Sequence, residues 1–285
     1  MPRPARFRSH PFHVFAAVAL VLSLDLIAAA QSSTTKKPAL TLDVLSAEYL
    51  PDTDTIRVKL INHSKKTATA YGIDISVLSN GKVLSQSGRA SDLLNLFVSQ
   101  QCGAGSKDSL AAIQPGEIEI DSQPANFDKT QLTTPEPEIH VTVVGIIWSD
   151  GTVEGDPKNP SGTLAMNRMQ KQREKDASDE AKIISILDEH QDDPDIHHRI
   201  REITEAVAAL ATAPPAQTEN ADPVHRRYTD ARSPVFTTFL TNLQISESSP
   251  SPKETFEAIT SFLACTHKER VAMLPPAAPA EAQLH

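Results

Sequence analysis

Apolar side chains recur at every second position through the first half of the chain, which is the spacing of half-buried β-strands. Ile56, Val58 and Leu60, for example, alternate with charged residues. The segments that carry this alternation are residues 40–44, 55–62, 71–77 and 118–120. The pattern predicts a strand in each of them, with Ile118 and Ile120 on a buried face like the apolar residues of the other three.

The segment 139–148 differs, because it is apolar on both of its faces. Strict alternation places Val141, Val143 and Ile147 on one face and Val144, Ile146 and Trp148 on the other. A strand that is apolar on both faces is covered on both faces. We expect one face to meet a second sheet, and we expect the C-terminal helices or a binding partner to cover the other.

Turn residues separate these strands. Asn80-Gly81 supplies the positive-φ pair that a tight hairpin requires, and Asp150-Gly151 is a second such turn. Six or seven short strands with turns between them, in roughly 115 residues, are typical of an antiparallel β-sandwich of immunoglobulin-like type. The sequence therefore predicts such a sandwich over residues 38–158.

Three short runs in this region carry a family resemblance. They are Asn62-His63-Ser64, Ala70-Tyr71 at the opening of a strand, and Pro115-Gly116-Glu117 before another. Together they resemble bacterial extracytoplasmic immunoglobulin-like modules of the FxLYD and CARDB sort, over residues 38–156, although the FxLYD signature itself is absent. The resemblance implies a sandwich fold and an adhesive or binding role.

After residue 162 the apolar period changes to that of helices. A single helical stripe is formed by Ile196, Ile200, Ile203, Val207 and Leu210. Asp193-Pro194, Ser233-Pro234 and Ser251-Pro252 each read as an N-cap followed by the first helical residue, and Glu254 completes a capping box in the last. The sequence thus predicts an α+β chain in which an all-helical region, 163–274, follows the sandwich.

Other parts of the C-terminal half are less apolar. In residues 164–190 the apolar side chains are dense only near Ile183 and Leu187. We therefore expect the first half of this helix to be exposed to solvent or to extend as an arm. Residues 213–232 read as a linker inside the helical region, and the Ala/Pro-rich residues 275–285 as a disordered tail.

The N-terminus has the composition of an export signal. Three arginines precede the apolar stretch 14–24, and Ala28-Ala29-Ala30 offers small side chains to a signal peptidase. We predict a signal peptide over residues 1–30, cleavage before Gln31, a disordered tether over 31–37, and a periplasmic or secreted protein. An uncleaved anchor is the alternative, but the run is shorter than the roughly 20 residues that span a bilayer.

The charge balance argues against two classes of partner. The 285 residues include 27 basic and 36 acidic side chains, and loss of residues 1–30 leaves a net charge of about −11. Such an acidic surface disfavours nucleic acid and anionic lipid, which both need basic patches. No stretch after the signal is apolar enough to form an integral membrane segment.

The chain has two cysteines, Cys102 and Cys265. Free cysteine is among the most buried residue types, so two buried thiols are the expectation. The alternative is a disulfide between the two halves of the chain, which an oxidising compartment would allow.

Two acidic segments are candidate cation sites. Asp150, Glu154 and Asp156 are candidate calcium ligands, and residues 188–198 gather carboxylates and imidazoles. Neither segment has a known ligand spacing. A plain hairpin turn explains the first without a metal ion, and a solvated turn in which Asp193 caps a helix explains the second.

The search for catalytic motifs finds no nucleophile elbow, no His-Glu-x-x-His and no phosphate-binding glycine loop, so no catalytic residue and no cofactor is assigned. We therefore expect an exported, non-catalytic protein. Its sandwich would act as a binding module for a protein partner, and its helical region would dock on the sandwich or mediate self-association. The alternative is a metal- or ligand-binding accessory protein that uses the acidic loop 150–156 or 188–198.

Overall fold

The computed structural model describes residues 41–104, 111–134, 136–212 and 233–275. The predicted signal peptide, the tether, the linker and nearly all of the tail lie outside these described residues. The described residues belong to one compact unit.

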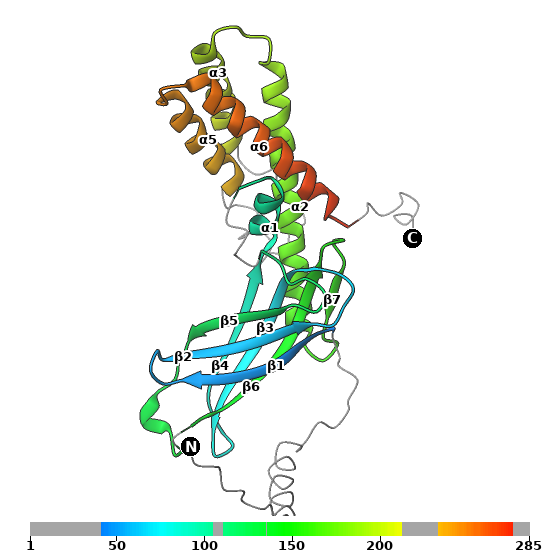
Figure 1. Ribbon diagram of the computed structural model, residues 1–285, viewed down its shortest axis with the longest axis vertical. Helices are drawn as coiled ribbons and strands as arrows, with labels where there is room; N and C mark the ends of the chain where they lie inside the picture. The colour runs from blue at the N-terminus through cyan, green and yellow to red at the C-terminus, as the bar shows by residue number, and fades with distance from the viewer. Residues whose placement is uncertain (1–40, 105–110, 135, 213–232, 276–285) are drawn as a thin grey trace, which may run out of the picture. The chain divides into compact units, whose positions relative to one another are not determined.

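The first part of this unit consists of two antiparallel sheets. In the described residues there are seven strands: β1 Leu42–Leu50, β2 Thr55–Asn62, β3 Ala68–Ser79, β4 Lys82–Asp92, β5 Ile118–Pro124, β6 Glu138–Trp148 and β7 Val153–Gly155. One sheet has the order β1-β2-β5 and the other the order β4-β3-β6-β7 (Figure 1). A hairpin with positive φ at Asn80 and Gly81 joins β3 to β4, as predicted.

Helices form the second part. They are α1 Leu94–Gln101, α2 Pro160–Glu189, α3 Ile196–Thr212, α5 Pro234–Glu247 and α6 Pro252–Ala272, with a short 3-10 turn at Lys129–Gln131. All except α1 and this turn follow the sheets in sequence, so the predicted α+β order of antiparallel sheets and then helices is confirmed. Helix α1, inserted between β4 and β5, was not predicted.

A common core fills the space between the two sheets. The predicted inward residues of β2 and β3 are all buried: Ile56, Val58 and Leu60 from β2, and Tyr71, Ile73, Ile75 and Val77 from β3. Their alternation with polar residues therefore predicted both the strands and the buried face.

Strand β5 contradicts the prediction that Ile118 and Ile120 are buried. These side chains are 42 % and 54 % exposed, while Asp121 between the sheets is buried. The Tyr71 hydroxyl donates to Oδ2 of Asp121 at 2.9 Å, and Arg89 Nη1 lies 2.9 Å from Oδ1. Because these partners satisfy an inward carboxylate, the isoleucines take the opposite face of the edge strand.

Strand β6 is covered on both faces, as predicted. Its residues, however, do not divide between the two faces by strict alternation. A register shift against β3 makes Val144 an extra residue. Beyond it Ile146 and Trp148 join the core between the sheets, while Ile147 packs beneath Met166 of α2. The C-terminal helices therefore cover the outer face, and Trp148 is buried between the sheets.

The first half of α2 packs on the sheet, which corrects the expectation of an exposed arm. Its contact face is formed by Gly162, Met166, Gln170 and Arg173, all buried. A Cβ atom on Gly162 would lie 2.5 Å from Cβ of Val144, so helix and strand approach more closely than a side chain permits. The sequence pattern missed this face because, apart from Met166, its residues are small, polar or charged.

Arg173 connects α2 to the β4-β3-β6-β7 sheet, and it is only 2 % exposed. Its Nε and Nη2 atoms donate to the two carboxylate oxygens of Asp92 at 3.2 and 2.6 Å. Its Nη1 donates to Thr69 Oγ1 at 3.0 Å, and Nη2 also donates to the Thr69 carbonyl at 2.9 Å. A buried cation is tolerated here because each nitrogen has an acceptor.

The second half of α2 forms a separate core with α3, α5 and α6. Ile200, Ile203 and Val207 of the predicted stripe are buried in it, and Ile196 and Leu210 pack against it. Helices α5 and α6 begin at Pro234 and Pro252 as predicted.

The predicted caps of these helices are only partly correct. Neither Ser233 nor Ser251 makes a side-chain capping bond, so the predicted capping box is not formed. Helix α3 is capped by Asp195 rather than Asp193, since Asp195 Oδ1 accepts from the backbone N–H groups of His197 and His198.

A disulfide joins Cys102, after α1, to Cys265 in α6, with an S–S distance of 2.03 Å. The expectation of two free thiols is therefore wrong. The spacing of the cysteines along the chain carries no information on their distance in space, and only the packing of α1 against α6 brings them together.

Gly162→Ala tests the close approach of α2 to β6. Overpacking costs about 1–3 kcal/mol, more than the roughly 0.5–1 kcal/mol that alanine gains over glycine in a helix. We expect a lower free energy of unfolding in urea, with Ser161→Ala at the exposed neighbouring position as control. Equal or greater stability of Gly162→Ala would contradict the packing.

Arg173→Met tests the ion pair between α2 and Asp92. Breaking a buried pair costs about 3–5 kcal/mol, and because the Asp92 side chain is 32 % exposed we expect a loss of about 2–4 kcal/mol. Lys171→Met, on the exposed side of the same helix, should change stability by less than about 0.5 kcal/mol. If the two variants unfold at the same urea concentration, Arg173 does not hold the helix.

Replacing both cysteines by serine tests the disulfide. The bond closes a loop with a sequence separation of 163 residues, and loss of a native disulfide typically costs about 2–5 kcal/mol. We expect the double variant and the reduced wild type to melt at the same, lower temperature. A wild type whose melting temperature is unaffected by reductant would show that the bond contributes no stability.

Candidate functional site

The carboxylates predicted as calcium ligands are each engaged elsewhere. Asp150 Oδ2 lies 2.6 Å from Lys66 Nζ. Partial burial opposes ionisation, but the hydrogen bonds from Lys66 and Thr152 lower the pKa of Asp150 to about 2. Glu154 accepts from Trp148 Nε1 at 3.1 Å and from the Thr41 backbone at 3.2 Å, and Asp156 accepts from the Lys158 backbone at 2.9 Å. The structure thus assigns the three carboxylates to separate partners.

Carboxylates of the acidic segment 188–198 contact the first turn of α3. Asp193 Oδ2 lies 2.5 Å from Nδ1 of His198, and this contact lowers the pKa of Asp193 and raises the pKa of His198. Asp195 caps the helix. Across the described ranges of the chain, no three His, Cys, Asp or Glu side chains gather closely enough to hold a metal ion.

Asn62, which begins the run Asn62-His63-Ser64 at the end of β2, is buried. Its side-chain nitrogen donates to the carbonyls of Lys66 and Ile113, both at 2.8 Å, and its oxygen accepts from the Ser64 backbone. The side-chain amide therefore holds the loop after β2 in place, and its nitrogen donates both of its hydrogen bonds to backbone carbonyls.

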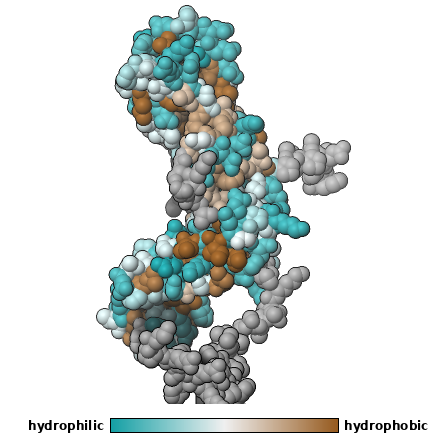
Figure 2. All heavy atoms as spheres, viewed as in Figure 1, coloured by the Kyte–Doolittle hydropathy of each residue, from teal (hydrophilic) through white to brown (hydrophobic). Residues whose placement is uncertain are grey.

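The outward face of the β1-β2-β5 sheet carries an apolar patch. Strand register places Ile61 beside Ile118 and Lys59 beside Ile120. Leu45, at the register shift of β1, lies on the same face next to Lys59 and is 54 % exposed. We call these five residues the outer β-face. Figure 2 shows hydrophobic surface gathered over this sheet.

The two basic residues on and beside the outer β-face, Lys59 and Arg57, differ in whether they have an ion-pair partner. At its border, Arg57 Nη1 lies 3.5 Å from Oε1 of Glu48. Within the described part of the chain, Lys59 has no ion pair or hydrogen bond from its side chain. The face therefore offers exposed aliphatic side chains around one unpaired cation.

The sequence pattern did not predict this face, because alternation alone indicated that Ile118 and Ile120 lie in the core. In the run Glu117-Ile118-Glu119-Ile120-Asp121 the period shows that the isoleucines share a face, but not which face. Arg89 and Tyr71, the partners of the Asp121 carboxylate, lie more than thirty residues away from it in sequence. No sequence pattern indicates that Ile61 and Leu45 lie on an outward face.

None of the helices in the described residues combines the length and the apolar character needed to cross a bilayer.

No protein-family model matches this sequence, and no curated protein sequence matches it either. Among solved structures, a hypothetical protein from Peptoclostridium difficile 630, known from an X-ray structure, shows a partial likeness. The identity is 11 %, the match covers 45 % of this chain and 92 % of that chain, and the TM-score is 0.29. A likeness of this degree carries no argument about fold or function.

Proposed function

We propose that the protein is an exported, non-catalytic binding module whose outer β-face docks a protein partner. The observation that carries the proposal is the orientation of β5, which exposes Ile118 and Ile120 and buries Asp121. Contiguous exposed apolar side chains on a regular sheet are typical of interaction surfaces. The role suggested by the family resemblance agrees with this.

The proposed fold of the sheet part is an immunoglobulin-like sandwich. Its strand order, β1-β2-β5 against β4-β3-β6-β7, supports this, because it corresponds to A-B-E against C′-C-F-G in such folds. The sheet part then presents one face to a partner while α2 covers the opposite sheet.

Export is supported by two independent features. Residues 1–30 have the composition of a signal peptide. The disulfide between Cys102 and Cys265 is of the kind that persists in oxidising compartments outside the cytosol. We accordingly place the mature protein in the periplasm or outside the cell.

The chemistry of the outer β-face specifies the kind of partner. Burial of Leu45, Ile118 and Ile120 favours apolar side chains opposite them. Lys59 would be desolvated in the same interface, and a buried cation needs a carboxylate nearby. The partner is therefore a protein surface with a carboxylate inside an apolar patch.

A photo-crosslinking amino acid at position 120 tests the proposal in the native host. We expect an adduct with a partner protein, and we expect Lys59→Glu to reduce its yield by about tenfold or more, because opposed like charges cost several kcal/mol. The matched control is the same probe at Val83, which is 51 % exposed on β4 of the other sheet.

Two results would overturn the proposal. Equal adducts from positions 120 and 83, or none from either, would show that the outer β-face has no specific partner. An adduct of twice the mass of this chain would show that the face binds a second copy instead.

A further inference from the structure

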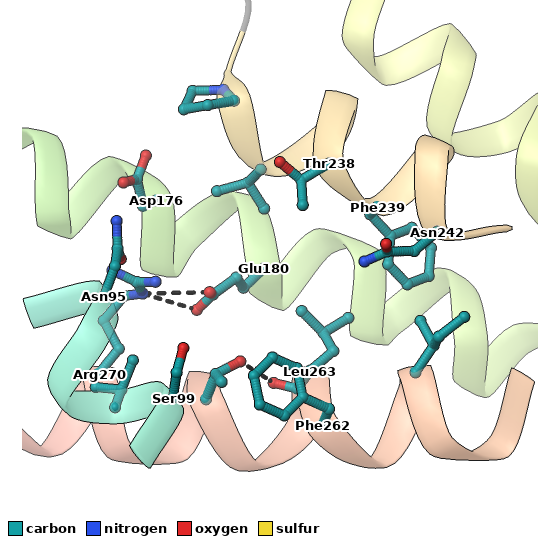
Figure 3. Close-up of a pocket in the computed structure, with 15 residues that line it drawn as sticks. Asn95, Ser99, Asp176, Glu180, Thr238, Phe239, Asn242, Phe262, Leu263 and Arg270 are labelled. Atoms are coloured by element: carbon teal, nitrogen blue, oxygen red, sulfur yellow. Dashed lines mark hydrogen bonds and ion pairs between the residues drawn. The ribbon is translucent and has the colours of Figure 1, made fainter. Parts of the chain in front are cut away.

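A second candidate site lies among the helices, apart from the outer β-face. Here α1, α2, α5 and α6 surround a pocket of about 230 Å³. Figure 3 shows Asp176, Asn95 and Arg270 toward one end of it, and Phe239, Phe262 and Leu263 toward the other. The pocket thus has a polar end with charged groups and an apolar end.

Arg270 lines the polar end and is only 6 % exposed. Its Nε atom donates to both carboxylate oxygens of Glu180, at 3.2 and 3.1 Å (Figure 3). Within the described residues, its two terminal nitrogens make no hydrogen bond. Arg270 is therefore neutralised by Glu180 but keeps free donors at the pocket.

Asp176 lines the same end and is 9 % exposed. Its Oδ1 accepts from Gln172 Nε2 at 2.8 Å, and Oδ2 has no partner in the described part of the chain. Burial raises the pKa of Asp176, Arg270 opposes this effect, and the nearby Glu180 and Asp179 carboxylates add to it. An ammonium group would supply both the missing hydrogen bond and the missing charge.

These two groups restrict the class of ligand. A simple carboxylate would pair with Arg270 but would meet the unpaired charge of Asp176. A simple amine would pair with Asp176 and leave the Arg270 donors unfilled. A buried polar group without a partner costs free energy, so a ligand that carries both groups is favoured over either alone.

We propose that this pocket binds a free α-amino acid with an apolar side chain. The ligand carboxylate accepts from the terminal nitrogens of Arg270, and its ammonium group donates to Asp176. The ligand side chain packs against Phe262 and Leu263. The volume suits one small molecule, because pockets for drug-sized ligands begin at about 300 Å³.

Calorimetric titration of the mature, disulfide-bonded protein tests the ligand class. The probes are L-leucine, 4-methylpentanoate, which lacks the amine, and 3-methylbutylamine, which lacks the carboxylate. We expect leucine to bind at least about tenfold more tightly than either single-charge probe. Equal affinity for one of them, or no binding of leucine, methionine or phenylalanine at millimolar concentration, would overturn the proposal.

Asp176→Asn tests the residue assigned to the ammonium group. The substitution keeps the size of the side chain and an acceptor for Gln172, and we expect leucine affinity to fall by at least about tenfold. Asp188→Asn, at an exposed position of the same helix, should bind leucine like the wild type. Unchanged leucine affinity in Asp176→Asn would refute the assignment.

The pH dependence of unfolding shows whether Asp176→Asn remains folded. The charged groups near Asp176 are Asp179 and Glu180 on α2 and Arg270 on α6, with His267 of α6 beside Glu180. Because the pKa of Asp176 is raised on folding, its ionised form destabilises the fold above the folded pKa. This cost disappears as the pH falls below the ordinary value of 3.8. The variant should therefore be at least as stable as the wild type at pH 7, and equal to it at pH 3.

Discussion

The guanidinium group of Arg173 is the contact on which the arrangement of this molecule depends. It reaches from α2 to Asp92 at the end of β4 and to Thr69 in β3. A cation in this position is stable only while every nitrogen has an acceptor, so the ion pair fixes the rotation of α2 about its own axis. The close contact of Gly162 with Val144 fixes the distance between α2 and β6. Together they make α2 a continuous support that begins on the sheet and ends in the helical core.

The same ion pair organises the neighbouring helix. Asp92 also accepts from the Leu94 backbone at the start of α1, so one carboxylate positions both α1 and α2. Helix α1 is linked to α6 by the disulfide, and α6 is linked to α2 by the buried pair of Arg270 and Glu180. These three connections close a ring of helices around the pocket. Its polar groups are therefore held in place before a ligand arrives, which reduces the entropic cost of binding.

The two proposed sites have different physical origins. On the outer β-face, apolar side chains are exposed because the inward carboxylate of Asp121 in β5 already has partners between the sheets. In the pocket, charged side chains are buried with part of their hydrogen-bonding capacity unfilled. The first arrangement favours a large apolar protein surface, and the second favours one small zwitterion. Since α2 covers only the sheet that contains β3 and β6, both sites remain open at once.

By itself, the sequence determined the strands of the core, the hairpin at Asn80-Gly81, the apolar stripe of α3 and the starts of α5 and α6. These features follow from local periodicity and backbone preference, which act between near neighbours along the chain. The tertiary structure alone determines that Ile118 and Ile120 face outward, that Val144 shifts the faces of β6, and that one face of the charged first half of α2 is buried. It also decided that Cys102 meets Cys265. Each of these depends on a partner distant in sequence, such as Asp92 for Arg173, and periodicity holds no information about such partners.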